Sequence, residues 1–255
     1  MFHQTDSVLD VEKEYSLRAV TRLSKRKRYL LPVVRYVTTA SVNERKYMTI
    51  NDVISNVEVY GLNPSIRGAK FPMSVDTSKL TEDITPGIMK LAQAERGSGH
   101  DNWLKGVIVQ FDLTLTVKAW TEAERYHWLD FVSSQSTMHK ITKFDLDTAY
   151  IKYVDPRIIA IVKEKVDEYN RLCQAVVPQS TDAIAEHERV KAEKYLEVLY
   201  NNPVGFRLSA RMSTNYLQLK TIYGQRRNHR LPEWRIFCQW IESLPMSELI
   251  TGGNT

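Results

Sequence analysis

Cysteine is scarce in this chain, and its scarcity excludes two classes of protein. Only Cys173 and Cys238 occur among 255 residues, too few for the disulfide framework of a secreted protein or for a zinc site built from cysteines. Cys173 stands beside Leu172 and close to Ala175 and Val176, so we expect a small buried thiol there. Two unpaired thiols are typical of a reducing compartment, and we expect a cytoplasmic protein.

Long hydrophobic runs are also missing. The longest apolar stretches, such as residues 29–34, are far shorter than the roughly 20 residues of a membrane-spanning helix. The first residues include His3, Asp6 and Asp10, where a secreted protein would carry a basic and then an apolar leader. The sequence therefore argues against a membrane protein.

Signatures of several enzyme classes are absent too. The sequence contains no Gly-x-Ser-x-Gly elbow, no His-Glu-x-x-His motif and no dinucleotide fingerprint. His100, His127, His139 and His229 lack the close spacing of metal ligands, so we predict no metal site. What remains is an ordinary globular composition, with 43% hydrophobic and 25% charged residues. The net charge of +5 favours anionic partners.

The first half of the chain has the pattern of strands. Val, Ile and Tyr favour strands at 30–38 and 54–60, and residues 105–116 alternate apolar and polar positions. Thr121 and Glu124 then form a Thr-x-x-Glu capping box, which predicts a helix towards Phe131. A short helix is predicted before these last elements, over residues 88–94.

The second half has helical periodicity. Asp155 and Ser180 are start signals for two helices, and further helices are predicted at 213–223 and 232–241. Cys173 lies on the expected apolar face of the first of these helices. With no repeat or linker, we expect one α+β domain over residues 1–255, with a basic segment at 1–30 and a frayed tail at 250–255.

Three groups of polar residues could carry function. The first, residues 97–102, is glycine-rich and contains His100, but it lacks the lysine and hydroxyl of a phosphate-binding loop. Glycine allows close approach of a ligand to the backbone, and it equally ends a helix. Both interpretations stay open.

The second group lies between residues 124 and 140. It combines cationic, amide and hydroxyl side chains that suit an anionic or heteroaromatic ligand: Arg125, His127, Gln135, Ser136, His139 and Lys140. The alternative is a polar loop whose hydroxyls cap neighbouring backbone groups.

The third group is a helical stripe in which Asn215 and Arg226 flank Leu219 and Ile222. Polar groups at the ends of a buried stripe need partners, because burying each unpaired costs about 1–3 kcal/mol. A ligand is one solution, and a structural ion pair from Arg226 to Glu233 is the other.

The second and third groups, in this order and at this separation, resemble the flavin-dependent thymidylate synthases, the ThyX family. That family has a strand, then Gln-x-x-Arg-His-Arg, then a loop ending in Ser-x-Arg-Tyr, and later a helix that begins at an asparagine and closes with an arginine. Here residues 126–128 stand where Arg-His-Arg is expected and residues 136–139 where Ser-x-Arg-Tyr is expected. The later helix is matched by the spacing from Asn215 to Arg226.

The resemblance implies a ThyX-like α+β fold with an antiparallel sheet and a helical second half. It implies FAD as cofactor, a pyrimidine nucleotide such as dUMP as substrate, and flavin-dependent methyl or one-carbon transfer to C5 from a folate donor. It also implies a homotetramer with sites between subunits. By position, the FAD contacts are His127 and Asn215, with Arg125 as a displaced substitute, and the nucleotide contacts are Ser136, Arg226, Gln135 and His139.

This sequence departs from the family at its signature. Tyr126 and Trp128 replace both arginines beside His127, and Met138 replaces the loop arginine. An arginine fork grips phosphate with two hydrogen bonds, which these residues cannot reproduce. The alternative is therefore a catalytically inactive ThyX-like protein that binds a nucleotide, a nucleic acid or a host protein. The altered loop resembles that of phage-encoded relatives, which implies the host cytoplasm as location.

Overall fold

The computed structural model describes residues 48–176 and 179–252. The chain divides into two units, residues 1–43 and residues 44–255, and the described helices and strands all belong to the second unit. The strand expected at 30–38 and the basic segment at 1–30 lie outside the described residues. The expectation of a single domain therefore stays a prediction.

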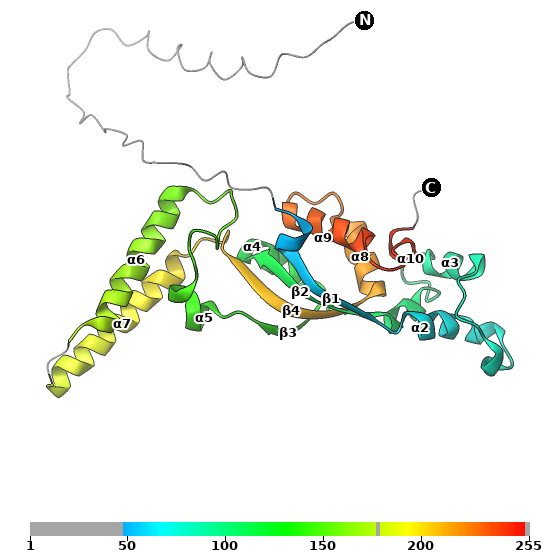
Figure 1. Ribbon diagram of the computed structural model, residues 1–255, viewed down its shortest axis with the longest axis horizontal. Coiled ribbons are helices and arrows are strands. Elements are labelled where there is room, and N and C mark those ends of the chain that lie inside the picture. The colour runs from blue at the N-terminus through cyan, green and yellow to red at the C-terminus, as the bar shows by residue number, and fades with distance from the viewer. Residues whose placement is uncertain (1–47, 177–178, 253–255) are drawn as a thin grey trace, which may run out of the picture. The chain divides into compact units, whose positions relative to one another are not determined.

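A four-stranded antiparallel sheet forms the centre of this unit (Figure 1), in the order β1-β2-β4-β3. Its strands are β1 (Ile54–Tyr60), β2 (Ile108–Thr116), β3 (Asp130–Ser134) and β4 (Arg207–Asn215). The predicted strand at 54–60 is confirmed. The strand predicted at 105–116 begins only at Ile108, because Asn102–Gly106 form a 3-10 helix, η3.

One face of the sheet carries the main core. The alternating side chains of β2 at Val109, Phe111, Leu113 and Leu115 are fully buried, as the alternation predicts. They belong to one hydrophobic cluster with three helices (Figure 1): α4 (Val117–Ala123), α8 (Tyr216–Arg226) and α9 (Pro232–Glu242). The helix predicted at 232–241 corresponds to α9, and the helix predicted at 213–223 corresponds to α8 except at residues 213–215, which belong to β4.

The other face of the sheet is polar. Arg211 of β4 forms ion pairs with Glu58 of β1 at 2.6 Å and with Asp112 of β2 at 3.3 Å. These pairs tie three strands together on the side away from the core. β3 is an edge strand, and all five of its residues are exposed.

Two long helices, α6 (Pro156–Gln174) and α7 (Thr181–Asn201), pack against each other and hold a second core cluster. Both predicted starts are confirmed, because the side chains of Asp155 and Ser180 accept bonds from the first turns. The prediction for Cys173 is wrong, since that thiol is exposed. Cys173 continues the stripe of Val162 and Val166 but lies in the last turn of α6, and no residue of α6 beyond Val166 belongs to the buried cluster.

The helix expected from the capping box at Thr121 is also wrong. The helix begins earlier, because Thr116 is the N-cap of α4 and accepts from the Ala119 amide at 3.1 Å. It ends at Ala123, and the residues expected to continue it form a turn and β3.

Short helices complete the described part. They are α1 (Ile50–Val53), α2 (Leu62–Ala69), α3 (Pro86–Ala92), α5 (Thr137–Lys140) and α10 (Glu248–Thr251), with 3-10 turns η1 (Phe71–Met73), η2 (Thr77–Lys79) and η4 (Ile141–Lys143). α3 corresponds to the helix predicted at 88–94. Ile250 of α10 is buried, and residues 253–255 of the expected tail lie outside the described range. No helix among the described residues is long and apolar enough to cross a membrane.

Candidate functional site

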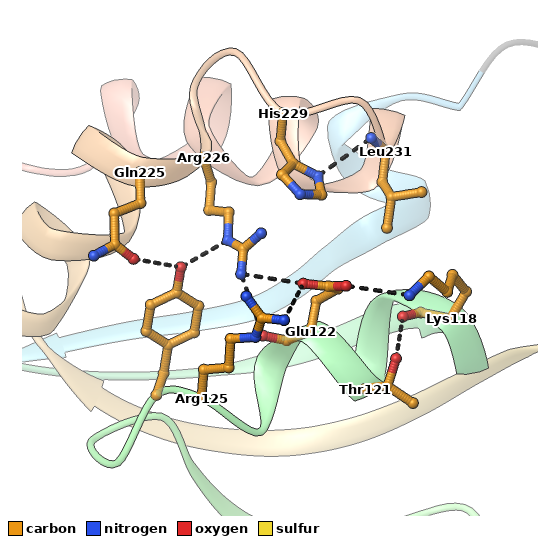
Figure 2. Close-up of polar contacts among 9 residues, drawn as sticks. Lys118, Thr121, Glu122, Arg125, Gln225, Arg226, His229 and Leu231 are labelled. Atoms are coloured by element: carbon orange, nitrogen blue, oxygen red, sulfur yellow. Dashed lines mark hydrogen bonds and ion pairs between the residues drawn. The ribbon is translucent and has the colours of Figure 1, made fainter.

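Arg226, at the end of α8, points into the buried side of the sheet and is only 7% exposed (Figure 2). Its Nε donates to the Tyr126 hydroxyl at 2.7 Å, and its Nη2 lies 3.5 Å from a carboxylate oxygen of Glu122. The guanidinium also stands over the Trp234 ring at 5.1 Å. The ion pair is therefore made with Glu122 and not with Glu233, which instead accepts from Thr116 at 2.6 Å.

Tyr126 stands where the resemblance expects an arginine. It is 7% exposed, and its hydroxyl donates to Gln225 at 3.0 Å while accepting from Arg226. Burial raises the pKa of Tyr126, so the phenol stays neutral and keeps its proton for Gln225. Tyr126 and Arg226 thus satisfy each other inside the protein.

Glu122 is the acidic centre of this network (Figure 2). It accepts from Lys118 at 3.1 Å and lies 3.5 Å from Arg125 and from Arg226. The bond from Lys118 is the main cause that lowers the pKa of Glu122, followed by the charges of the two arginines. Arg125 faces this carboxylate with a side chain that is 68% exposed.

The residues expected to contact FAD come from adjoining segments. His127 and Trp128 are exposed on the turn after α4, and the Thr214 hydroxyl donates to the Trp128 carbonyl at 2.6 Å. That bond holds the turn against the end of β4, next to Asn215. The Asn215 side-chain oxygen caps α8 by accepting from Gln218 at 2.9 Å.

Three of the residues expected to contact the nucleotide lie towards the other end of β4. Gln135 continues β3, since its amide donates to the Ser209 carbonyl and its side-chain oxygen accepts from the Ser209 amide, both at 2.9 Å. Ser136 is the N-cap residue of α5 without a side-chain cap bond, and His139 is exposed. Ser209 and Thr214 are about 17 Å apart along an extended strand.

Within one chain, the predicted nucleotide contacts therefore lie in two separate places. Gln135, Ser136 and His139 follow the edge strand, whereas Arg226 lies among Tyr126 and Trp234 on the covered face. The stripe prediction for α8 is confirmed, because Leu219 and Ile222 are buried between two buried polar ends. The residue spacing along α8 alone could not identify Glu122 of α4 as the partner of Arg226.

A polar cavity of about 580 Å³ lies where α5 and η4 meet α6 and α7. His139 lines it, together with residues that the sequence did not single out: Met138, Thr142, Lys143, Tyr169, Asn170, Cys173, Gln174 and Tyr195. The four-residue spacing of Asn170 and Gln174 could have indicated from the sequence that both amides lie on one face of α6.

The glycine-rich segment at 97–102 has a structural role. Gly97 and Gly99 have φ of 91° and 81°, which favours glycine, and the buried Asp101 pairs with Lys220 at 2.8 Å. His100 lines a mostly apolar cavity of about 1060 Å³ beside α3. Among the described residues, no group of three or more histidine, cysteine or acidic side chains could hold a metal.

Comparison with known proteins gives the fold. No protein-family model and no curated protein matches this sequence. A solved structure of the flavin-dependent thymidylate synthase ThyX from Helicobacter pylori, complexed with FAD and dUMP, superposes with a TM-score of 0.52 at 15% identity. A second structure of ThyX from that organism, also with FAD and dUMP, gives 0.53 at 14% identity. Each comparison covers 77% of this chain and 97% of the other, so the chain has a ThyX-like α+β fold.

Proposed function

We propose that this chain binds a pyrimidine nucleotide such as dUMP on its ThyX-like scaffold, and uses FAD for a methyl or one-carbon transfer to C5. The observation that carries the proposal is that the turn with Arg125 and His127 is held against the end of β4, next to Asn215. These residues are up to 90 positions apart in the sequence, yet they occupy adjoining segments of a fold found in enzymes solved with FAD and dUMP.

The residue types fit FAD. Arg125 and His127 offer donors to its phosphates, and the ring of Trp128, 60% exposed, offers a surface for stacking. The Asn215 oxygen is committed to the helix cap, so its amide nitrogen is the group left to donate. FAD would supply hydride transfer when bound, and these side chains would hold and orient it.

A second copy of the chain completes the proposed nucleotide site, as the family resemblance implies. In one chain, Gln135 lies beside Ser209 and the turn at Trp128 lies beside Thr214, about 17 Å further along β4, and the edge strand β3 between them is exposed. Phe131 and Val132 on that strand are 54% and 61% exposed, and an unpaired edge of this kind is a place for another chain to pack. A homotetramer is the form that the resemblance implies.

Titration calorimetry of the full chain with dUMP, with deoxyuridine as control, tests the proposal. We expect saturable heat for dUMP and a much weaker response to deoxyuridine, because phosphate carries much of the binding. A yellow preparation, or uptake of added FAD, supports the flavin part. Absence of any dUMP binding would contradict the proposal as a whole.

A binding protein without the transfer reaction is a second candidate, and one observation favours it. The position of a family arginine is taken by Tyr126, which is bonded to Arg226 in the interior. Neither group is then free for phosphate in this arrangement. A colourless protein that binds dUMP but takes up no FAD would select this candidate; nucleic acid or a host protein would then be further partners to test. Phage origin and a host cytoplasmic location stay predictions.

A further inference from the structure

The cavity beside α5 has a lining suited to an anion. Its volume of about 580 Å³ is in the range of small-molecule sites. Lys143, His139, Asn170 and Gln174 bring nitrogen donors to it, and none of its described lining residues is an aspartate or a glutamate. A ligand with several acceptor oxygens matches such a lining.

Lys143 differs from the lysines of α6 and α7. The four lysines of α6 and α7 that lie near acidic side chains are all paired: Lys163 with Asp147, Lys165 with Glu197, Lys191 with Glu188, and Lys194 with Glu168. Lys143 has no carboxylate partner among residues 48–176 and 179–252. Its charge is therefore available to a ligand in the cavity.

Two tyrosines fix the walls of the cavity. The Tyr195 hydroxyl donates to the Met138 carbonyl at 2.9 Å, which ties α5 to α7, and the rings of Tyr169 and Tyr195 lie 5.0 Å apart. A hydrogen bond with Cys173, and then burial, raises the pKa of Tyr169 to about 12. The site is held open by packing between elements distant in the sequence, which reduces the ordering that binding requires.

We propose that this cavity binds a phosphate monoester group, with Lys143 and His139 as the charged contacts and Asn170 and Gln174 as amide donors. A lysine ammonium serves as a point charge for phosphate, and the amides add directed hydrogen bonds. The inference rests on the proposed function only in naming dUMP as the carrier of that group. Free inorganic phosphate has the same chemistry and is the other source.

The chain contains its own reporter for occupancy. Cys173 lines the cavity and is exposed, whereas Cys238 is 2% exposed. The rate at which Cys173 reacts with the neutral reagent 4,4′-dithiodipyridine can be followed with dUMP, inorganic phosphate or deoxyuridine present. We expect dUMP and phosphate to slow the reaction in a saturable way and deoxyuridine to leave it unchanged.

A pair of variants locates the effect. Lys143→Gln should raise the concentration of dUMP needed for half-protection about tenfold, as expected for loss of one charge-assisted contact. Lys105→Gln is the matched control, because it removes the same charge from an exposed lysine of η3 outside the cavity lining. This variant should change the half-protecting concentration of dUMP less than about twofold, because the effect of a charge outside the cavity is screened by salt.

The outcomes separate this inference from the proposed function. Calorimetric binding of dUMP without protection of Cys173 would overturn the cavity assignment and leave the proposed function standing. Protection by inorganic phosphate in a chain that does not bind dUMP would support the cavity and refute the proposed function. Equal losses in the two lysine variants would also overturn the assignment.

Discussion

Arg226 illustrates how a buried charge is understood only through its partners. The helical stripe predicts its burial, and the sequence leaves a ligand and an ion pair as alternatives. The structure gives it Tyr126, Glu122 and Trp234 as neighbours. A guanidinium with these contacts contributes to the stability of the fold whether or not it also contacts a ligand in an assembly.

We therefore predict that Arg226→Ala lowers the free energy of unfolding by about 3 kcal/mol, because it removes a buried ion pair with Glu122 and a buried hydrogen bond to Tyr126, and leaves a cavity beside Trp234. Urea denaturation measures the change. Arg227→Ala is the control, since Arg227 is the exposed neighbour in the same chain segment. Equal, small losses in the two variants would mean that Arg226 is held for a ligand.

His229 is a second residue whose environment makes a prediction. Its Nδ1 accepts from the Leu231 amide at 3.2 Å, just before α9 (Figure 2). Burial, and then the charge of Arg226, lowers the pKa of His229 below its usual 6.5, although nearby Glu122 opposes the shift. The folded state thus binds this proton less readily than the unfolded chain does.

The stabilisation from neutral His229 is fully present above pH about 6.5 and is lost as the pH falls through the lower folded value. We expect the melting temperature to fall between pH 7.5 and pH 5.5, and to fall less in His229→Ala. The variant should be less stable than the parent at pH 7.5. Parallel pH profiles for the two proteins would rule out this role for His229.

At the scale of elements, Asn215 ends β4 and caps α8. Substitutions at this position can test its capping role separately from any contact with a ligand. Asn215→Ala should cost about 1 kcal/mol of stability, whereas Asn215→Asp keeps the capping oxygen and should cost little. If the Asn215 amide also contacts FAD, the aspartate variant keeps its stability and loses flavin absorbance. Equal destabilisation by both substitutions would contradict the cap.

The sequence predicts elements whose local signals are consistent. β1 and the starts of α6 and α7 follow from β-branched runs and cap residues. The sequence-based prediction fails where two helix-start signals compete. Thr116 and Thr121 both offer caps, and the cap chosen is the one at the end of β2, because α4 must turn onto the sheet there.

β3 and β4 show a different cause of failure. Over residues 208–213 of β4, Leu208, Ala210 and Met212 alternate with Ser209, Arg211 and Ser213, a pattern without β-branched or aromatic residues, and β3 ends in two serines. Their strand state comes from pairing with residues far along the chain, such as Ser213 with Gln110. No local pattern contains that information.

At the scale of the whole molecule, local sequence patterns likewise do not determine how the parts of the proposed site are placed. The sequence predicts which residues are polar and grouped, but distances between groups depend on strand register. The register places Gln135 beside Ser209 and the turn at Trp128 beside Thr214. It thus separates the two halves of the predicted site along one edge, which is why the proposed nucleotide site needs a second copy of the chain.

Native mass spectrometry of the full chain tests nucleotide binding in that assembly most directly, because subunit number and retained small molecules are read in one spectrum. In the presence of dUMP we predict an oligomer that carries dUMP, and in the presence of deoxyuridine the same oligomer without a bound nucleotide monophosphate. A monomer, or an oligomer that retains neither dUMP nor FAD, would contradict a nucleotide site shared between copies of this chain.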